Sequence, residues 1–128
     1  MHILLEHGKN QALSRHFNSS EFECKCKQPR CNSSFIATEL LDVLRDVRRY
    51  FGAPVKITSG YRCITHNESV GGAVRSQHPM GTAADIQVAG IEPIKVQDYL
   101  EDQYPDTYGI GRYTTFTHID VRENKARW

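Results

Sequence analysis

The spacing of apolar residues predicts two helices. Between residues 36 and 51, apolar side chains recur every three or four positions, and charged residues fill the other face. This is the period of an amphipathic helix, so we predict a helix over 36–51. Gly52 follows directly and is expected to end it. A second helix is predicted from Pro93, which suits a first helical turn, to just before Pro105.

Short alternating runs predict the strands. We expect four of them, over residues 55–58, 84–88, 108–113 and 115–121. In the second, Asp85 and Gln87 share one face, opposite two β-branched residues. The last two strands are separated by a tight turn and are expected to pair with each other. A brief helix is also expected over 65–70.

The order of these elements predicts the fold class. Residues 1–34 show no clear period and are expected to be irregular. The strands near the end of the chain pair locally, so we predict an α+β fold with a mainly antiparallel sheet and helices packed on one side. The length of 128 residues suits a single domain spanning 1–128.

Charge and hydropathy exclude several classes of partner. The formal net charge is +1, which gives no basic field for nucleic acid. The apolar run at residues 3–5 is broken by Glu6 and is too short for a signal-peptide core or a membrane span. We therefore expect a protein made in the cytoplasm without a signal peptide, with no membrane span, and monomeric.

The four cysteines, Cys24, Cys26, Cys31 and Cys63, allow three interpretations. Without a secretory signal, free thiols in a turn-rich loop are favoured. Their spacing departs from the paired CxxC pattern of a zinc ribbon, although a structural metal site that uses Cys63 stays open. Disulfides are the third interpretation, for a protein that acts outside the cytoplasm.

Two separated segments carry the candidate chemistry. His78 and Asp85 lie seven residues apart around Gly81, which allows the chain to turn back. Downstream, His118 and Asp120 share one face of a predicted strand. If the two strands are neighbours, Asp85 and His118 meet across them. Two histidines and one aspartate suit Zn²⁺ with an open fourth position for water, which is the catalytic pattern.

The same residues resemble a known family. The segment Ser76-x-His78-x-x-Gly81-x-Ala83-x-Asp85 is similar to the SxHxxGxAxD signature of the zinc D-alanyl-D-alanine carboxypeptidases. That family includes peptidoglycan endopeptidases and phage endolysins, and its fold is shared by the zinc domain of hedgehog signalling proteins. The upstream Ser59-Gly-Tyr-Arg run and the ending Thr-His118-Ile-Asp-Val-Arg also resemble the family. The resemblance runs from about residue 12 to the end.

The resemblance implies roles for individual residues. His78, Asp85 and His118 are expected to be the zinc ligands. Arg62 is expected to polarise the substrate carbonyl and stabilise the oxyanion, although a structural ion pair is the alternative for it. Ser76 is expected to contribute to substrate binding. The implied substrate is a peptidoglycan peptide, and the implied setting is a phage or prophage enzyme that reaches the cell wall after release or as part of a virion.

One departure from the family bears on catalysis. Many members place a glutamate three residues before the last histidine, or a histidine two before it, and here those positions are Thr115 and Phe116. Asp120 is the nearest candidate for the general base. It is equally suited to fixing the tautomer of His118. The alternative function is a non-catalytic zinc-binding module, either wall-docking or phage structural, and a cysteine-zinc interaction domain is a weaker third.

Overall fold

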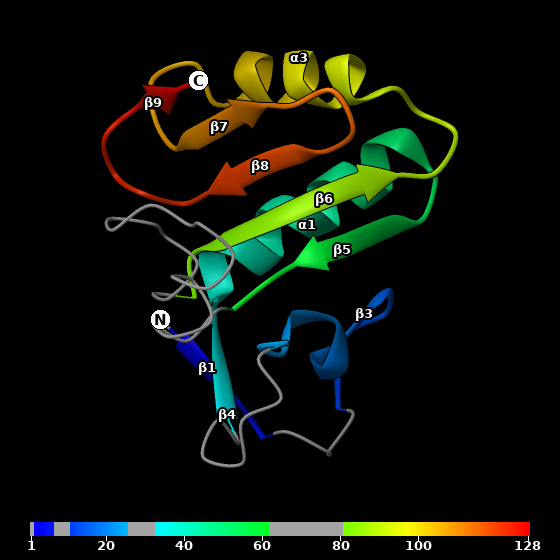
Figure 1. Ribbon diagram of the computed structural model, residues 1–128, viewed down its shortest axis with the longest axis vertical. Helices are drawn as coiled ribbons and strands as arrows, with labels where there is room; N and C mark the ends of the chain where they lie inside the picture. Colours follow the sequence, from blue (N-terminus) through cyan, green and yellow to red (C-terminus); the bar gives the residue numbers. More distant parts are fainter. Residues whose placement is uncertain (1, 7–10, 26–32, 62–80) are drawn as a thin grey trace.

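The computed structural model describes residues 2–6, 11–25, 33–61 and 81–128. Its largest sheet has five strands in the order β5-β6-β8-β7-β9 (Figure 1). The bounds of these strands are β5 Val55–Ser59, β6 Ala83–Val88, β8 Thr117–Asp120, β7 Gly109–Arg112 and β9 Ala126–Arg127. All neighbours are antiparallel except β7 and β9, which pair in parallel.

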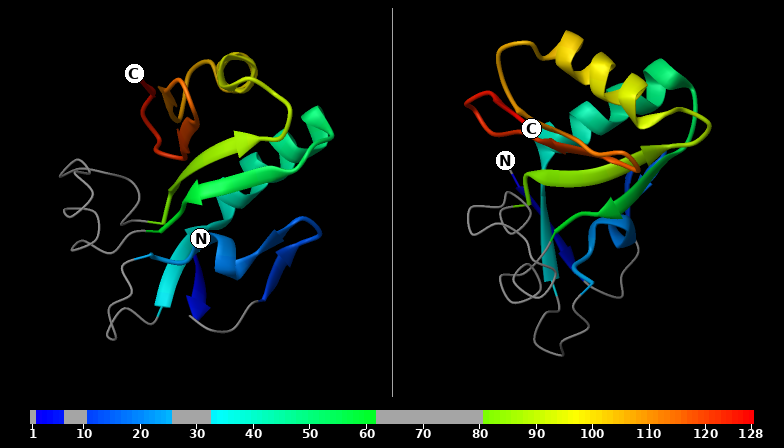
Figure 2. Two further views of the ribbon diagram at one scale, coloured as in Figure 1. Left: turned by 45° about the vertical axis from the view of Figure 1, so that its right-hand side comes forward. Right: turned by 45° about the horizontal axis from the view of Figure 1, so that its top comes forward.

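The two described long helices lie on one face of this sheet. Helix α1 (Thr38–Phe51) contacts β5 and β6, and helix α3 (Pro93–Gln103) contacts β6, β7 and β8 (Figure 2). The helices also touch each other, since the rings of Tyr50 and Tyr99 stack at 3.9 Å. This arrangement confirms the α+β fold with a mainly antiparallel sheet and helices on one side.

A charged hydrogen bond links the two helices. The Tyr99 hydroxyl donates to Asp46 Oδ2 over 2.6 Å, and Arg49 donates to the other oxygen of the same carboxylate. Burial alone would raise the pKa of Asp46, but the hydrogen bonds from Tyr99 and Arg49 lower it overall. The contact therefore favours the ionised carboxylate between the helices.

Apolar side chains from the sheet and from both helices fill the space between them. Alternation along the strands places one set of side chains inward, while the helical period supplies the other. The fully buried members include Leu40, Leu44, Val47, Ile86, Val96, Leu100, Ile110 and Ile119. Since Ile86 and Ile119 point toward the helices, their strand neighbours point to the opposite face of the sheet.

The first long helix ends as predicted but begins later. Gly52 adopts the left-handed conformation at φ 60° and its N–H donates to Arg48 O, which confirms the expected stop. The start is at Thr38 because residues 36 and 37 belong to β4 (Ser33–Ala37), which pairs with β1 (His2–Glu6). Pairing between strands distant in sequence overrides the local helical period here.

The prediction that residues 1–34 are irregular was wrong. Besides β1, this segment contains the short antiparallel pair β2 (Ala12–Ser14) and β3 (Phe17–Asn18), followed by the 3-10 helix η1 (Ser19–Phe22). Phe17 and Phe22 are both buried in the core and lie 6.1 Å apart. The strands are too short to show a period in the sequence.

The remaining elements agree closely with expectation. The strands predicted over 55–58 and 84–88 are β5 and β6, and the predicted hairpin is β7 and β8. Strand β9 was not predicted. The brief helix expected over 65–70 lies outside the described residues. No helix in the described part of the chain is both long and apolar enough to cross a membrane.

Candidate metal centre

Strand register brings Asp85 and His118 together. The two residues are direct partners in the β6–β8 ladder, and both point away from the helices. His118 Nδ1 lies 2.9 Å from Asp85 Oδ1, and each residue is only 7% exposed. The predicted meeting of Asp85 and His118 across neighbouring strands is therefore present in the structure.

Asp120 holds the other nitrogen of the same ring. His118 Nε2 lies 2.8 Å from Asp120 Oδ2. Arg122 donates from Nε to Asp120 Oδ1 and from a terminal nitrogen to Oδ2, both over 2.7 Å, and its backbone N–H donates to Oδ1 over 3.2 Å. Asp120 is fully buried, and both of its oxygens are engaged. Asp120 and Arg122 thus fix the orientation of the His118 imidazole from its Nε2 side.

The charges of this cluster favour an anionic carboxylate at residue 120. Burial alone would raise the pKa of Asp120, but its bonds to His118 and Arg122 lower that pKa to about 2. Burial alone would lower the pKa of His118, but the bonds to Asp120 and Asp85 outweigh it and raise that pKa. An anionic acceptor beside Nε2 keeps a proton on that nitrogen, so loss of the second ring proton would leave the Nδ1 lone pair free for a metal ion.

Two glycines in β7 make room for this cluster. Gly109 pairs with Asp120 and Gly111 pairs with His118. A Cβ atom at Gly109 would overlap the Asp120 carboxylate, and one at Gly111 would come within 2.8 Å of the Trp128 ring. Glycine within a strand often marks such a close approach.

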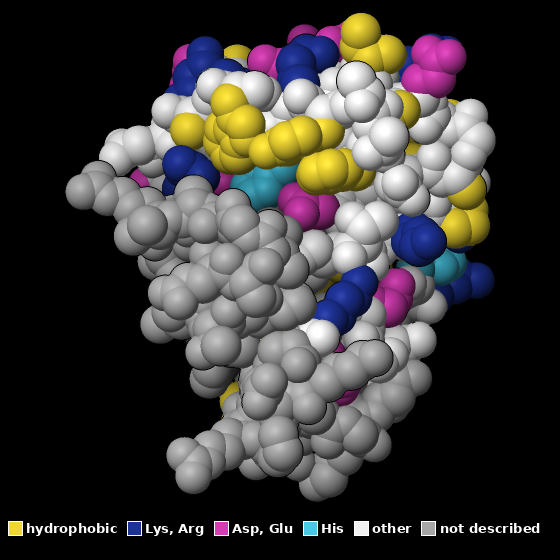
Figure 3. Space-filling model, in the orientation of Figure 1, with side chains coloured by type: hydrophobic (Ala, Val, Ile, Leu, Met, Phe, Trp, Pro, Cys, Tyr) yellow, Lys and Arg dark blue, Asp and Glu magenta, His cyan; other side chains and the backbone are white. Residues whose placement is uncertain are grey.

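An aromatic row borders the histidine. The Trp128 ring lies 4.9 Å from the His118 ring and 5.3 Å from the Arg122 guanidinium. Trp128 Nε1 donates to the Tyr113 hydroxyl, and the Tyr113 ring stacks on Phe116 at 4.4 Å. Figure 3 shows hydrophobic side chains in a row directly beside a histidine and an acidic side chain on this face. The row forms an apolar wall next to the polar pair.

The Asp85–His118 pair fits a zinc ion. Carboxylate oxygen and imidazole nitrogen are both zinc donors, and the backing of a ligand histidine by a carboxylate is common at zinc sites. Two donors on one tetrahedral zinc, bonded at 2.0–2.2 Å, lie about 3.3 Å apart. The observed 2.9 Å needs to open by only a few tenths of an ångström.

The described residues do not complete a metal site by themselves. Within 2–6, 11–25, 33–61 and 81–128, no group of three or more His, Cys, Asp or Glu side chains is placed to hold a metal. Asp120 cannot serve with Asp85, because the two carboxylates lie on opposite nitrogens of one ring. The predicted third ligand, His78, lies outside the described residues. Asp85 and His118 are therefore two candidate ligands on the sheet face that the helices leave uncovered.

Comparison with known families identifies the class of protein. Residues 15–120 match the family model described as Peptidase M15, so the chain belongs to the peptidase M15 family. Membership supports a metallopeptidase, and peptidases of this family are generally zinc-dependent. The resemblance to zinc D-alanyl-D-alanine carboxypeptidases is thereby confirmed at the level of the family. No curated protein sequence gives a significant match.

The structure places only some of the predicted site residues. Asp85 and His118 are brought together, whereas Arg62, Ser76 and His78 lie outside the described residues and their roles stay predictions. Asp120 lies beside His118, and its role as the general base stays a prediction. The contacts favour the orienting alternative, because both of its oxygens already accept hydrogen bonds.

One of the four cysteines lies in the described part of the chain. Cys24 is buried, and its backbone N–H donates to Ser34 Oγ over 2.9 Å. Cys26, Cys31 and Cys63 lie outside the described residues, so the three interpretations of these cysteines stay predictions.

The sequence did not assign roles to Arg122, Trp128, Gly109 and Gly111. Two signals pointed to three of them, and none pointed to Trp128. Arg122 lies two residues after Asp120, at a spacing that places side chains of a strand on one face. The Gly109-x-Gly111 pair within a predicted strand is a sign of close approach by another group.

Proposed function

We propose that this protein is a zinc peptidase that hydrolyses a peptide bond in the stem peptide or cross-link of peptidoglycan, in a phage or prophage setting. The observation that carries the proposal is the Asp85 Oδ1–His118 Nδ1 pair at 2.9 Å, backed by Asp120 on the far nitrogen. The match to the M15 family supports a peptide substrate, and the motif of residues 76–85 supports the peptidoglycan class.

The described residues would prepare the site in three ways. Asp85 and His118 would hold zinc together with His78. Asp120 accepts a hydrogen bond from His118 Nε2–H, which keeps Nδ1 available as a metal ligand, and Arg122 keeps Asp120 anionic. Zinc supplies a Lewis acid that activates water and polarises a peptide carbonyl when it is bound.

The aromatic row would position the peptide. Tyr113 and Trp128 are 42% and 46% exposed, so part of each side chain remains open to a ligand beside His118. Aromatic side chains bury large areas at low conformational cost. We propose that the backbone of the stem peptide lies along this wall. Arg62 would stabilise the oxyanion that develops at the carbonyl, as expected from the family motif.

The burial of Asp120 favours a second candidate function, a non-catalytic zinc-binding module. Asp120 is the nearest base that the sequence offers, yet it is fully buried and engaged by Arg122 and His118. A non-catalytic zinc module that docks on the cell wall would have this arrangement without a free base. The two functions differ in turnover and agree in zinc binding.

Hydrolysis of purified peptidoglycan tests the proposal. The zinc-loaded protein should lower the turbidity of the suspension and release new amino groups, and a chelator should stop both. His118→Ala should be inactive in the same assay. Arg112→Gln changes an exposed ion pair with Asp98 and Glu101 and serves as the matched control. Zinc binding and wall binding without any released amino groups would support the docking module instead.

A further inference from the structure

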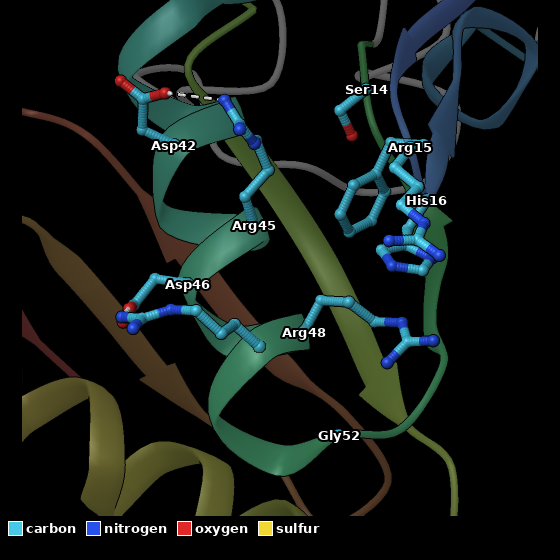
Figure 4. A pocket seen from close by; sticks show the side chains of 10 residues that line it. Ser14, Arg15, His16, Asp42, Arg45, Asp46, Arg48 and Gly52 are labelled. Carbon is cyan, nitrogen blue, oxygen red and sulfur yellow. Dashed lines mark hydrogen bonds and ion pairs between the residues drawn. The ribbon is translucent and has the colours of Figure 1, made fainter.

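A basic cleft lies apart from the His118 site. It occupies about 550 Å³ between the turn of the β2–β3 pair and the outer side of α1 (Figure 4). Its lining includes Ser14, Arg15, His16, Arg45, Arg48 and Arg49. None of these residues belongs to the His118 site. Since α1 covers the sheet face opposite His118, the cleft is not part of the proposed peptide path.

Ion pairs neutralise only part of its charge. Arg45 pairs with Asp42 at 3.9 Å, and Arg49 pairs with Asp46 at 2.5 Å. In the part of the chain that the structure describes, Arg15 and Arg48 have no carboxylate partner. These two arginines therefore leave a positive charge in the cleft that its own acids do not balance.

The two unbalanced arginines face one histidine. Figure 4 shows Arg48 reaching from α1 toward His16, while Arg15 precedes His16 in the turn across the cleft. Loss of surrounding water and the charges of Arg48 and Arg15 lower the pKa of His16. The other charged groups that line the cleft are the paired Asp42–Arg45 and Asp46–Arg49. The histidine is thus held in a positive field that a bound anion would relieve.

A buried hydroxyl lines the same cleft. The Oγ atom of Ser14 is inaccessible to solvent and has no hydrogen-bond partner among the described residues. Buried polar atoms in proteins almost always have a partner, because leaving one without a hydrogen bond costs free energy. Figure 4 shows this hydroxyl on the hairpin side of the cleft, next to Arg15. Rotation of the Ser14 hydroxyl toward the cleft would allow a ligand oxygen to supply the missing partner.

We propose that this cleft binds a phosphate group, held by Arg15, Arg48 and His16 with Ser14 as an additional donor. Guanidinium forks match the oxygens of a phosphate, and the pairs they form are stronger than neutral hydrogen bonds. A tetrahedral phosphate has oxygens directed to both sides of a cleft, whereas a planar carboxylate has two oxygens in one plane. The ligand is therefore a free phosphate or a phosphodiester within a longer anionic chain.

Titration with inorganic phosphate, followed by NMR of the His16 ring protons, tests the proposal. The wild-type protein should bind phosphate saturably, with a rise in the pKa of His16. The double variant Arg15→Gln/Arg48→Gln should bind at least about tenfold more weakly, since two charge-assisted partners are lost. Arg45→Gln removes one charge from the same helix face, but its arginine is already paired with Asp42, so its affinity should stay within about threefold of wild type.

The variant Ser14→Ala distinguishes phosphate bound in a specific position in the cleft from phosphate attracted only by the positive charge. It leaves every charge in place and should weaken phosphate binding by several-fold without lowering the melting temperature. Acetate at equal ionic strength should compete poorly. The proposal is overturned if wild type shows no saturable binding, if Ser14→Ala binds as well as wild type, or if Arg45→Gln loses as much affinity as the double variant. Tighter binding of a glycerol phosphate oligomer than of phosphate would assign the polymer, and equal binding would assign the free ion.

Discussion

Asp120→Asn isolates the contact that distinguishes an orienting residue from a general base. The wild-type carboxylate accepts from His118 Nε2 and from three donors of Arg122. An asparagine keeps the shape but replaces one acceptor oxygen with an NH₂ group. In either orientation of the amide, its NH₂ group faces two hydrogen-bond donors, which are either two nitrogens of Arg122 or one nitrogen each of Arg122 and His118.

The contacts of Asp120 set the size of the expected effect. Without the Asp120 carboxylate, the neutral His118 ring can carry its proton on Nδ1 and donate a hydrogen bond to Asp85. A protonated Nδ1 cannot bind zinc. Loss of the outer partner of a ligand histidine weakens metal binding by about 10–100-fold. Each buried donor left without an acceptor also costs about 1–3 kcal/mol of stability.

Two measurements on the same samples distinguish the two roles. Zinc affinity is measured by competition with a chromophoric chelator, and hydrolysis is measured at saturating zinc. We expect Asp120→Asn to lose affinity by about 10–100-fold, while Asp98→Asn, the same change at an exposed ion pair, leaves it unaltered. Unchanged zinc affinity, with hydrolysis slowed by about a hundredfold, would refute the orienting role and identify Asp120 as the base.

Contacts elsewhere in the protein allow three further tests. Gly109→Ala drives a Cβ into the Asp120 carboxylate, so urea unfolding should show a loss of about 1–3 kcal/mol, and stability equal to wild type would contradict this packing. Tyr99→Phe removes a hydrogen bond to an ionised Asp46 and should cost about 1.5–3 kcal/mol at pH 7. Because the pKa of Asp46 is lowered, this difference should shrink only as the pH falls below the usual aspartate range and through the lowered pKa, where the folded carboxylate becomes protonated; a difference independent of pH would rule out the charged contact. Arg62→Lys should keep zinc and fold yet lose about 2.7–4 kcal/mol of transition-state stabilisation in kcat/KM, whereas a near wild-type rate on peptidoglycan would make Arg62 structural.

Elements with a strong local period were predictable from the sequence. The spacing of apolar residues placed α1 to within two residues at its start, and Gly52 marked its end. The alternation around Asp85 and His118 indicated that both side chains leave the same side of the sheet. Because strand alternation and sheet pairing follow simple rules, the amino-acid sequence alone was enough to predict this part of the site.

Contacts between segments distant in sequence were not predictable. Strands β1 and β4 stabilise each other across about thirty residues, so neither shows a signal alone. The position of Trp128 against His118 depends on β9 pairing in parallel with β7, which local patterns do not encode. The contact that favours the orienting role of Asp120 comes from Arg122, whose side chain turns back onto the carboxylate.

Stepwise zinc titration of the metal-free protein tests the central claim most directly. Release of amino groups from purified peptidoglycan is recorded after each addition of zinc. If Asp85 and His118 hold a catalytic zinc with His78, activity should rise in proportion to added zinc and level off at one zinc per chain, with no rise for His118→Ala. Zinc uptake without release of amino groups, or full release by the metal-free protein, would contradict the account.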